Sequence, residues 1–133
     1  MSRVCKICFA GLVLMVSLPA SGKPFSCPSS PPATWNLADA RLNSVRVLSF
    51  PVGEPPMDEQ ALPIMAPFHE RLQGKILYQT WNMNFDAPRY KFQVDCLYSG
   101  TERFLRRDAP GVKQCVARST PKASGNLISF TCH

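Results

Sequence analysis

The feature that most constrains the fold of this chain is an alternation of side chains along residues 91–98. One set is apolar and the other largely polar: Phe92, Val94, Cys96 and Tyr98 alternate with Lys91, Gln93, Asp95 and Leu97. Because successive side chains leave a β-strand on opposite faces, a period of two indicates a strand with one buried face. The turn formers Ser99 and Gly100 then predict a hairpin in which residues 101–107 return antiparallel. A second turn signal at residues 108–111 predicts a third strand at residues 112–118.

Three further segments have the β-branched and aromatic content of strands, at residues 45–50, 75–85 and 127–132. Residues 35–42 fit a helical turn capped by Asn36 as well as an irregular strand. Six strands, mostly consecutive and antiparallel, predict an all-β fold. We expect a single small antiparallel meander that curls into a barrel or sandwich.

The least regular part of the chain is the Pro-rich stretch at residues 51–74. Each proline removes a backbone donor and fixes φ, so no long element is expected there. Apolar residues nevertheless recur in it: Met57, Leu62, Ile64, Met65 and Phe68. Such a stretch is too apolar for a linker, and we expect a long loop that packs over one end of the sheet, with a short helix at residues 68–72 as an option.

The first 22 residues have the composition of a secretory signal peptide. Arg3 and Lys6 precede an apolar run at residues 7–18, and small residues follow at 20–22. A run of this length falls short of the roughly 20 residues that a membrane span needs. Residues 24–26 also fit poorly as a lipoprotein signal before Cys27. The sequence therefore predicts cleavage after Gly22 and one secreted or periplasmic domain at residues 23–133.

The cysteines of that domain are four in number: Cys27, Cys96, Cys115 and Cys132. An even count in a small exported domain indicates two disulfide bonds. In the hairpin register above, Cys96 and Cys115 lie on opposite faces with a strand between them, beyond the roughly 7 Å that a disulfide allows between Cα atoms. This favours Cys27–Cys96 with Cys115–Cys132. A single β-bulge would reverse the parity and favour Cys96–Cys115 with Cys27–Cys132.

The mature domain is basic. Removing Arg3 and Lys6 leaves 13 basic and 9 acidic residues, a net charge of +4, and residues 101–122 alone carry a net +4. A basic stripe is typical of a surface that meets nucleic acid, an anionic envelope surface or an acidic partner, and export argues against nucleic acid. The predicted partner-binding residues are Arg103, Arg106, Arg107 and Lys113. The alternative is a sheet edge that these charges merely keep soluble.

The sequence contains no recognisable catalytic constellation. His69 is the only histidine before the last residue, and no serine near it stands in a nucleophile motif. The acids are scattered, and the one confident strand acid, Asp95, is expected to face Phe104 with Arg106 as a diagonal neighbour in a surface ion pair. No phosphate-binding loop or metal-ligand spacing is present. We therefore predict no catalytic residue, no metal and no cofactor.

Several short motifs resemble a family of small, secreted, uncharacterised proteins of Gram-negative bacteria. The motifs span nearly all of the mature chain: Cys27-Pro28, Trp35, residues 50–56, Trp81, the C-x-Y-x-G-T hairpin at 96–101 and the P-G-V-x-x-C return at 110–115. This resemblance implies export and implies no activity. A weaker resemblance, carried by residues 123–125, is to the periplasmic inhibitors of c-type lysozyme, which are small disulfide-linked β-barrels. The tyrosine expected after that loop and the companion Thr-Lys-Gly motif are missing.

These observations lead to the hypothesis of a non-catalytic exported binding protein, an inhibitor or immunity-type protein that blocks a partner protein. The alternatives are an envelope structural or accessory subunit, then a small-ligand binder or a hydrolase. A ligand groove would be lined by aromatic residues that we assign instead to the core: Trp35, Tyr78, Trp81, Phe85, Tyr90, Phe92 and Tyr98.

Overall fold

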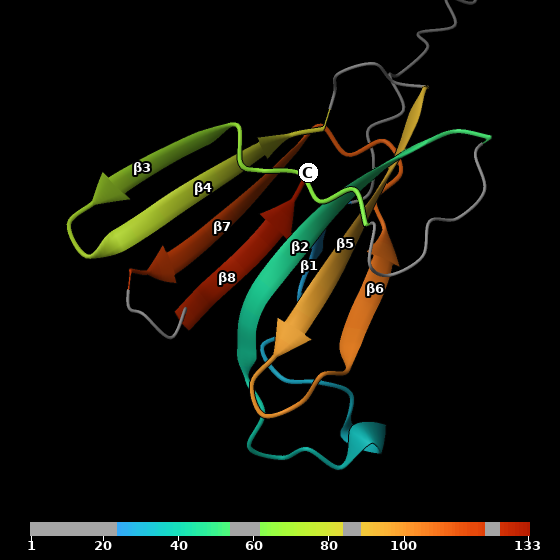
Figure 1. The fold of residues 1–133 in the computed structure, drawn as a ribbon. Coiled ribbons are helices and arrows are strands. Elements are labelled where there is room, and N and C mark those ends of the chain that lie inside the picture. Colours follow the sequence, from blue (N-terminus) through green and yellow to red (C-terminus); the bar gives the residue numbers. More distant parts are fainter. Residues whose placement is uncertain (1–23, 54–61, 84–88, 122–125) are drawn as a thin grey trace, which may run out of the picture.

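The chain folds into two antiparallel β-sheets that pack face to face (Figure 1). A computed structural model describes residues 24–53, 62–83, 89–121 and 126–133. The five-stranded sheet has the order β1-β8-β7-β4-β3 and the three-stranded sheet the order β2-β5-β6. The strand bounds are β1 Phe25–Ser26, β2 Leu42–Pro51, β3 His69–Gln73, β4 Ile76–Asn82, β5 Tyr90–Tyr98, β6 Phe104–Asp108, β7 Gln114–Thr120 and β8 Asn126–Cys132. The all-β prediction is confirmed in a sandwich-like form, whereas the expected signal peptide lies outside the described residues.

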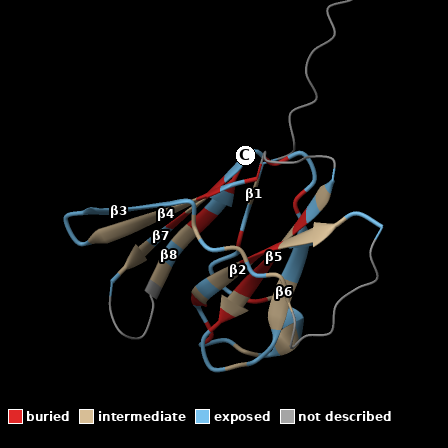
Figure 2. Cartoon of the chain, turned by 45° about the horizontal axis from the view of Figure 1, so that its top comes forward, coloured by how far each residue is buried: buried red, intermediate tan, exposed pale blue. Residues whose placement is uncertain are grey.

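The central alternation behaves as predicted. Phe92, Val94, Cys96 and Tyr98 of β5 are all buried in the core between the sheets. Across from them the five-stranded sheet contributes a second buried set: Trp81, Cys115, Ala117, Phe130 and Cys132. Buried residues gather where the two sheets face each other, while β3 is exposed along its whole length (Figure 2). One end of the larger sheet therefore extends beyond the core.

The predicted hairpin between β6 and β7 is wrong. β6 pairs with β5 and β7 pairs with β4 and β8, so the chain crosses from one sheet to the other at residues 109–113. Ala109 and Val112 are buried in this crossover, and the Ala109 N–H donates to the Phe92 carbonyl at 3.0 Å. The turn-forming residues at this point therefore mark a change of sheet, with apolar side chains of the crossover buried in the core.

The β5–β6 hairpin forms with a register shifted by two residues. Residues 99–103 make the connection in place of a two-residue turn, and Asp95 lies directly opposite Arg106 rather than Phe104. Gly100 has a φ of 72°, which suits glycine, and the Arg103 N–H donates to Thr101 Oγ1 at 3.0 Å. The shift is even in number, so each side chain keeps its predicted face.

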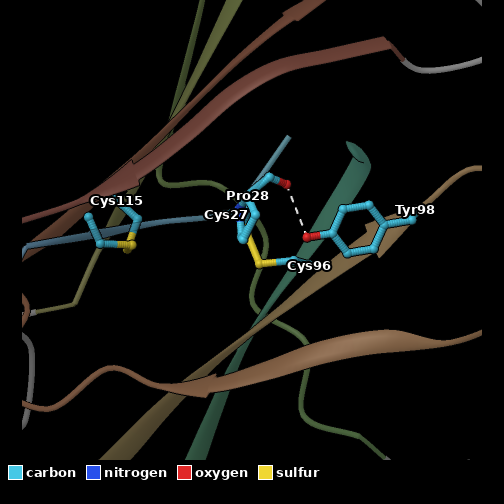
Figure 3. The surroundings of a disulfide bond; sticks show 6 residues. Cys27, Pro28, Cys96, Tyr98 and Cys115 are labelled. Carbon is cyan, nitrogen blue, oxygen red and sulfur yellow. Dashed lines mark hydrogen bonds between the residues drawn. A yellow bond between two sulfur atoms is a disulfide. The ribbon is translucent and has the colours of Figure 1, made fainter. Parts of the chain in front are cut away.

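Both favoured disulfides are confirmed. Cys115 and Cys132 are direct cross-strand partners in β7 and β8, with their Cα atoms 4.1 Å apart. Cys27 and Cys96 join the end of β1 to β5 and so connect the two sheets (Figure 3). The barrier to a Cys96–Cys115 bond was predicted to be an intervening strand, but the two residues lie in different sheets.

Two other segments differ from expectation. Residues 68–72 form no helix, since β3 occupies His69–Gln73 and pairs with β4. Residues 33–35 form a single 3-10 turn, and Asn36 ends it in a left-handed conformation instead of capping its start. The N-terminal segment is also held by more than Cys27, because β1 pairs with β8 and the Tyr98 hydroxyl donates to the Pro28 carbonyl at 3.0 Å (Figure 3).

Candidate functional site

Residues 62–67, the described part of the Pro-rich stretch, lie alongside β2. The Ser49 N–H donates to the Pro63 carbonyl at 3.1 Å, and the Met65 N–H donates to the Val47 carbonyl at 2.8 Å. Ile64 forms an isolated bridge with Leu48, which is fully buried although it lies outside the main core cluster. The loop was expected to pack over one end of the sheet, and these residues instead cover the free side of β2.

This segment also reaches the other sheet. The indole Nε1 of Trp81 donates to the Met65 carbonyl at 3.1 Å, so a side chain of β4 fixes the position of a residue beside β2. Met65 packs against the core. Residues 62–67 therefore connect the two sheets at the point where they begin to separate.

A cleft of about 480 Å³ opens next to this connection. Its walls come from both sheets and from the connecting segment, and they are mainly apolar: Val45, Ile64, Met65, Ala66, Pro67, Trp81, Ala117 and Leu127, with Asn43, Ser44, Gln79 and Ser119. The volume lies in the range of small-ligand and peptide sites in proteins. Such a space is expected where two sheets diverge, because the inner face of each sheet stays apolar beyond the point where the sheets are in contact.

The apolar surface continues from the cleft to the edge of the larger sheet. Leu72 lies opposite Leu77, which lies opposite Ser119 of the cleft wall. Three large apolar side chains at this end are exposed, with 58% of Ile64, 79% of Phe68 and 61% of Leu72 accessible to solvent. We call residues 62–68, β3 and residues 76–79 of β4 the open end of the sandwich.

On the outer face of the three-stranded sheet, Asp95 is fully buried between two arginines. Its carboxylate accepts two bonds from Arg106, at 2.8 and 3.0 Å, and lies 2.9 Å from an Arg46 guanidinium nitrogen. The three residues form one cross-strand row through β2, β5 and β6. Both arginines also lie over the Phe104 ring, at 4.8 and 5.1 Å from its centroid. The expected surface ion pair is thus a buried charge with two partners, a stabilising element of the small sheet.

The four predicted binding residues lie on and around β6 and in the crossover that follows it. Arg106 is bound to Asp95, and Arg107, next to it on β6, points to the opposite face. Arg103 lies over the Trp35 ring at 4.4 Å, in the connection between β5 and β6. Lys113 lies in the crossover before β7, where its carbonyl accepts a bond from Met83 N–H. The structure does not bring the four together on one face.

Two titratable side chains outside the Asp95 row are His69 and Tyr98. His69 is exposed on β3 beside Glu70, which accepts a 2.7 Å bond from Gln79. Burial raises the pKa of the Tyr98 phenol, and the charge of Arg107 partly opposes this rise. Within the described ranges, no three histidine, cysteine or acidic residues are grouped so that they could hold a metal ion.

The sequence indicates some of the residues that line the cleft but does not predict the cleft. The apolar residues in the Pro-rich stretch were recognised as unusual, and Ile64 and Met65 are among its walls. Their position beside β2 depends on long-range backbone bonds for which the sequence carries no local signal.

No protein-family model, curated protein or solved structure matches this chain. In the part of the chain that the structure describes, no helical segment has the length and hydropathy of a membrane span.

Proposed function

We propose that this chain is a non-catalytic exported protein that acts by binding a partner protein, as an inhibitor or immunity-type protein. The exported compartment is supported by the two disulfides, which form and persist under oxidising conditions. The weak indications of chemistry, a surface histidine and a structural buried carboxylate, support a binding role in place of turnover.

One observation carries this proposal: the open end of the sandwich exposes large apolar side chains beside an apolar cleft. Ile64, Phe68 and Leu72 are each more than half accessible. Apolar surface that is contiguous and fixed on a rigid frame is typical of interaction sites, because burying it on association is favourable. The bonds of residues 62–67 to β2 and Trp81 hold this surface in place, so little ordering entropy is lost when a partner binds.

The experiment is capture of the partner on the immobilised, oxidised mature chain from periplasmic extract of the source organism. An inhibitor should retain one hydrolase at stoichiometric yield and suppress its activity. Replacement of Phe68 and Leu72 by serine should abolish both effects, with the free energy of unfolding nearly unchanged since both residues are exposed.

The matched control replaces two exposed apolar residues elsewhere, Val52 and Ile128, by serine. Capture that is lost equally in both double variants would contradict a role for the open end. Retention of envelope assembly components would instead indicate a structural or accessory subunit.

A further inference from the structure

β3 is an unprotected edge of the larger sheet. It pairs only with β4, and all five of its residues are exposed. An antiparallel strand with one neighbour leaves about half of its backbone N–H and C=O groups facing solvent, ready to pair with another strand. β2, by contrast, has residues 63 and 65 bonded along its free side. The larger sheet can therefore be extended at β3.

The outer face of this sheet is basic at the same edge. Arg71, Tyr78 and Arg118 form one cross-strand row through β3, β4 and β7, with the two guanidinium groups 5.1 and 5.8 Å from the Tyr78 ring centroid. The described acids lie elsewhere: Asp39, Glu102, Asp95 and Asp108 are in loops or the small sheet, and Glu70 bonds to Gln79 of the cleft wall. No described carboxylate thus compensates the two arginines on this face.

The edge strand β6 of the small sheet differs from β3 in its charges. On β6, Arg106 and Asp108 share one face, so that edge presents both charges. On β3 the outer residues are His69, Arg71 and Gln73, without an acid among them. The inner face carries Leu72 and Glu70, whose carboxylate is already bonded to Gln79, and the exposed Phe68 directly precedes the strand. The two faces of β3 therefore suit different side chains of a partner. Carboxylates complement the outer face, and apolar side chains fit against Leu72 on the inner face.

We propose that β3 accepts an extended segment of the partner as an added strand, in which acidic and apolar residues alternate. The segment pairs with the free backbone groups of β3. Its acidic side chains meet Arg71 and His69 on the outer face, and its apolar side chains cover Leu72 and Phe68 towards the cleft. This inference rests on the proposed binding function and names the chemistry of the partner's binding segment.

A second copy of the chain fits this edge less well. Antiparallel self-pairing that uses the whole of β3 places Arg71 opposite Arg71. Like charges directly opposite each other destabilise a strand pair. Charge complementarity therefore favours an acidic strand from a different protein.

The test uses a short synthetic peptide of alternating valine and glutamate, labelled for fluorescence anisotropy, and the oxidised mature chain. The peptide should bind, and added salt should weaken it. Arg71→Glu should weaken binding by about tenfold, because a direct cross-strand attraction becomes a repulsion. The matched control Lys91→Glu, an exposed reversal on β5 of the other sheet, should leave the affinity unchanged.

Two further peptides separate strand addition from charge alone. The first is methylated on alternate backbone amides. Of the two ways to choose these amides, the one that removes the N–H groups facing β3 should abolish binding. The second has all its valines first and all its glutamates after them, and it should bind much more weakly. Equal binding of all these peptides, or equal binding of a sulfated polysaccharide, would reduce the site to a general anion surface and overturn the inference. Absence of peptide binding, or a chain dimer that Arg71→Glu strengthens or disrupts, would overturn it as well.

These outcomes leave the proposed function separately testable. If the partner is still captured and inhibited through Phe68 and Leu72 while the peptide fails to bind, only the strand-addition inference fails. If no partner is captured in any variant, the proposed function fails.

Discussion

The two ends of the larger sheet differ in what holds them. Where β7 and β8 face β2 and β5, the inner side chains are buried, and both disulfides lie in this region. At the open end the same sheet continues through β3, where every residue is exposed (Figure 2). Large apolar side chains face solvent there. The comparison teaches that stability is concentrated in one region and that the other is free to present surface, a division common in binding proteins.

The largest loss of unfolding free energy should come from removing the Cys27–Cys96 disulfide, which joins the two sheets. Cys27–Cys96 spans 69 residues of sequence and Cys115–Cys132 spans 17. Since loop-closure entropy grows with loop length, replacement of each pair by alanine should lower the free energy of unfolding by about 4.4 and about 3.1 kcal/mol respectively. Urea unfolding followed by circular dichroism measures both. A larger loss from the shorter loop would contradict the view that the Cys27–Cys96 bond holds the sheets together.

A pair of phenylalanines compares the two regions directly. Phe130 is fully buried and its ring lies 5.9 Å from that of Trp81, so Phe130→Ala should cost about 4 kcal/mol of unfolding free energy. Phe68→Ala, at the open end, should change it by less than about 0.5 kcal/mol. The same denaturation experiment checks both variants. Similar losses would mean that Phe68 is part of the folding core and not a free binding residue.

Replacing the buried Asp95 tests how much its charge stabilises the three-stranded sheet. Asp95→Asn removes the charge that holds Arg46 and Arg106 together, and breaking such a pair costs several kcal/mol when the site is dry. Because about a third of each arginine side chain reaches solvent, we expect about 2 kcal/mol instead. The control is Asp108→Asn, which alters one exposed bond from Gln93. A loss no greater than that of the control would make the Asp95 row an ordinary surface feature.

The smallest effect should appear at Tyr98. Tyr98→Phe removes the hydroxyl bond to Pro28 and should cost about 1 kcal/mol near neutral pH. Burial raises the pKa of Tyr98 in the folded chain, so the neutral phenol contributes stability below its ordinary pKa of about 10 and loses it as the pH rises through the raised value. The difference between the wild type and the variant should therefore shrink above about pH 10. A difference that grows with pH would contradict this assignment.

The sequence was most informative where structure depends on local pattern. The alternation of residues 92–98 predicted the buried face of β5. The favoured disulfides are also present, although their ranking assumed a β6–β7 hairpin that does not form. The turn signals at residues 108–111 could not distinguish a hairpin from a crossover, because that choice depends on how Ala109 and Val112 are buried between distant strands. The open end could not be predicted from the sequence for the same reason, because the bonds of Pro63 and Met65 to β2 join residues far apart in sequence.

Hydrogen exchange of backbone amides, measured with the chain alone and with its captured partner, tests the central claim most directly. The β3 amides that are not bonded to β4 should exchange rapidly in the free chain, because they lie at an exposed edge, and should become protected in the complex. Amides of β5 should be protected in both states. New protection confined to residues 103–113, or none anywhere in the open end, would contradict binding at this end of the sandwich.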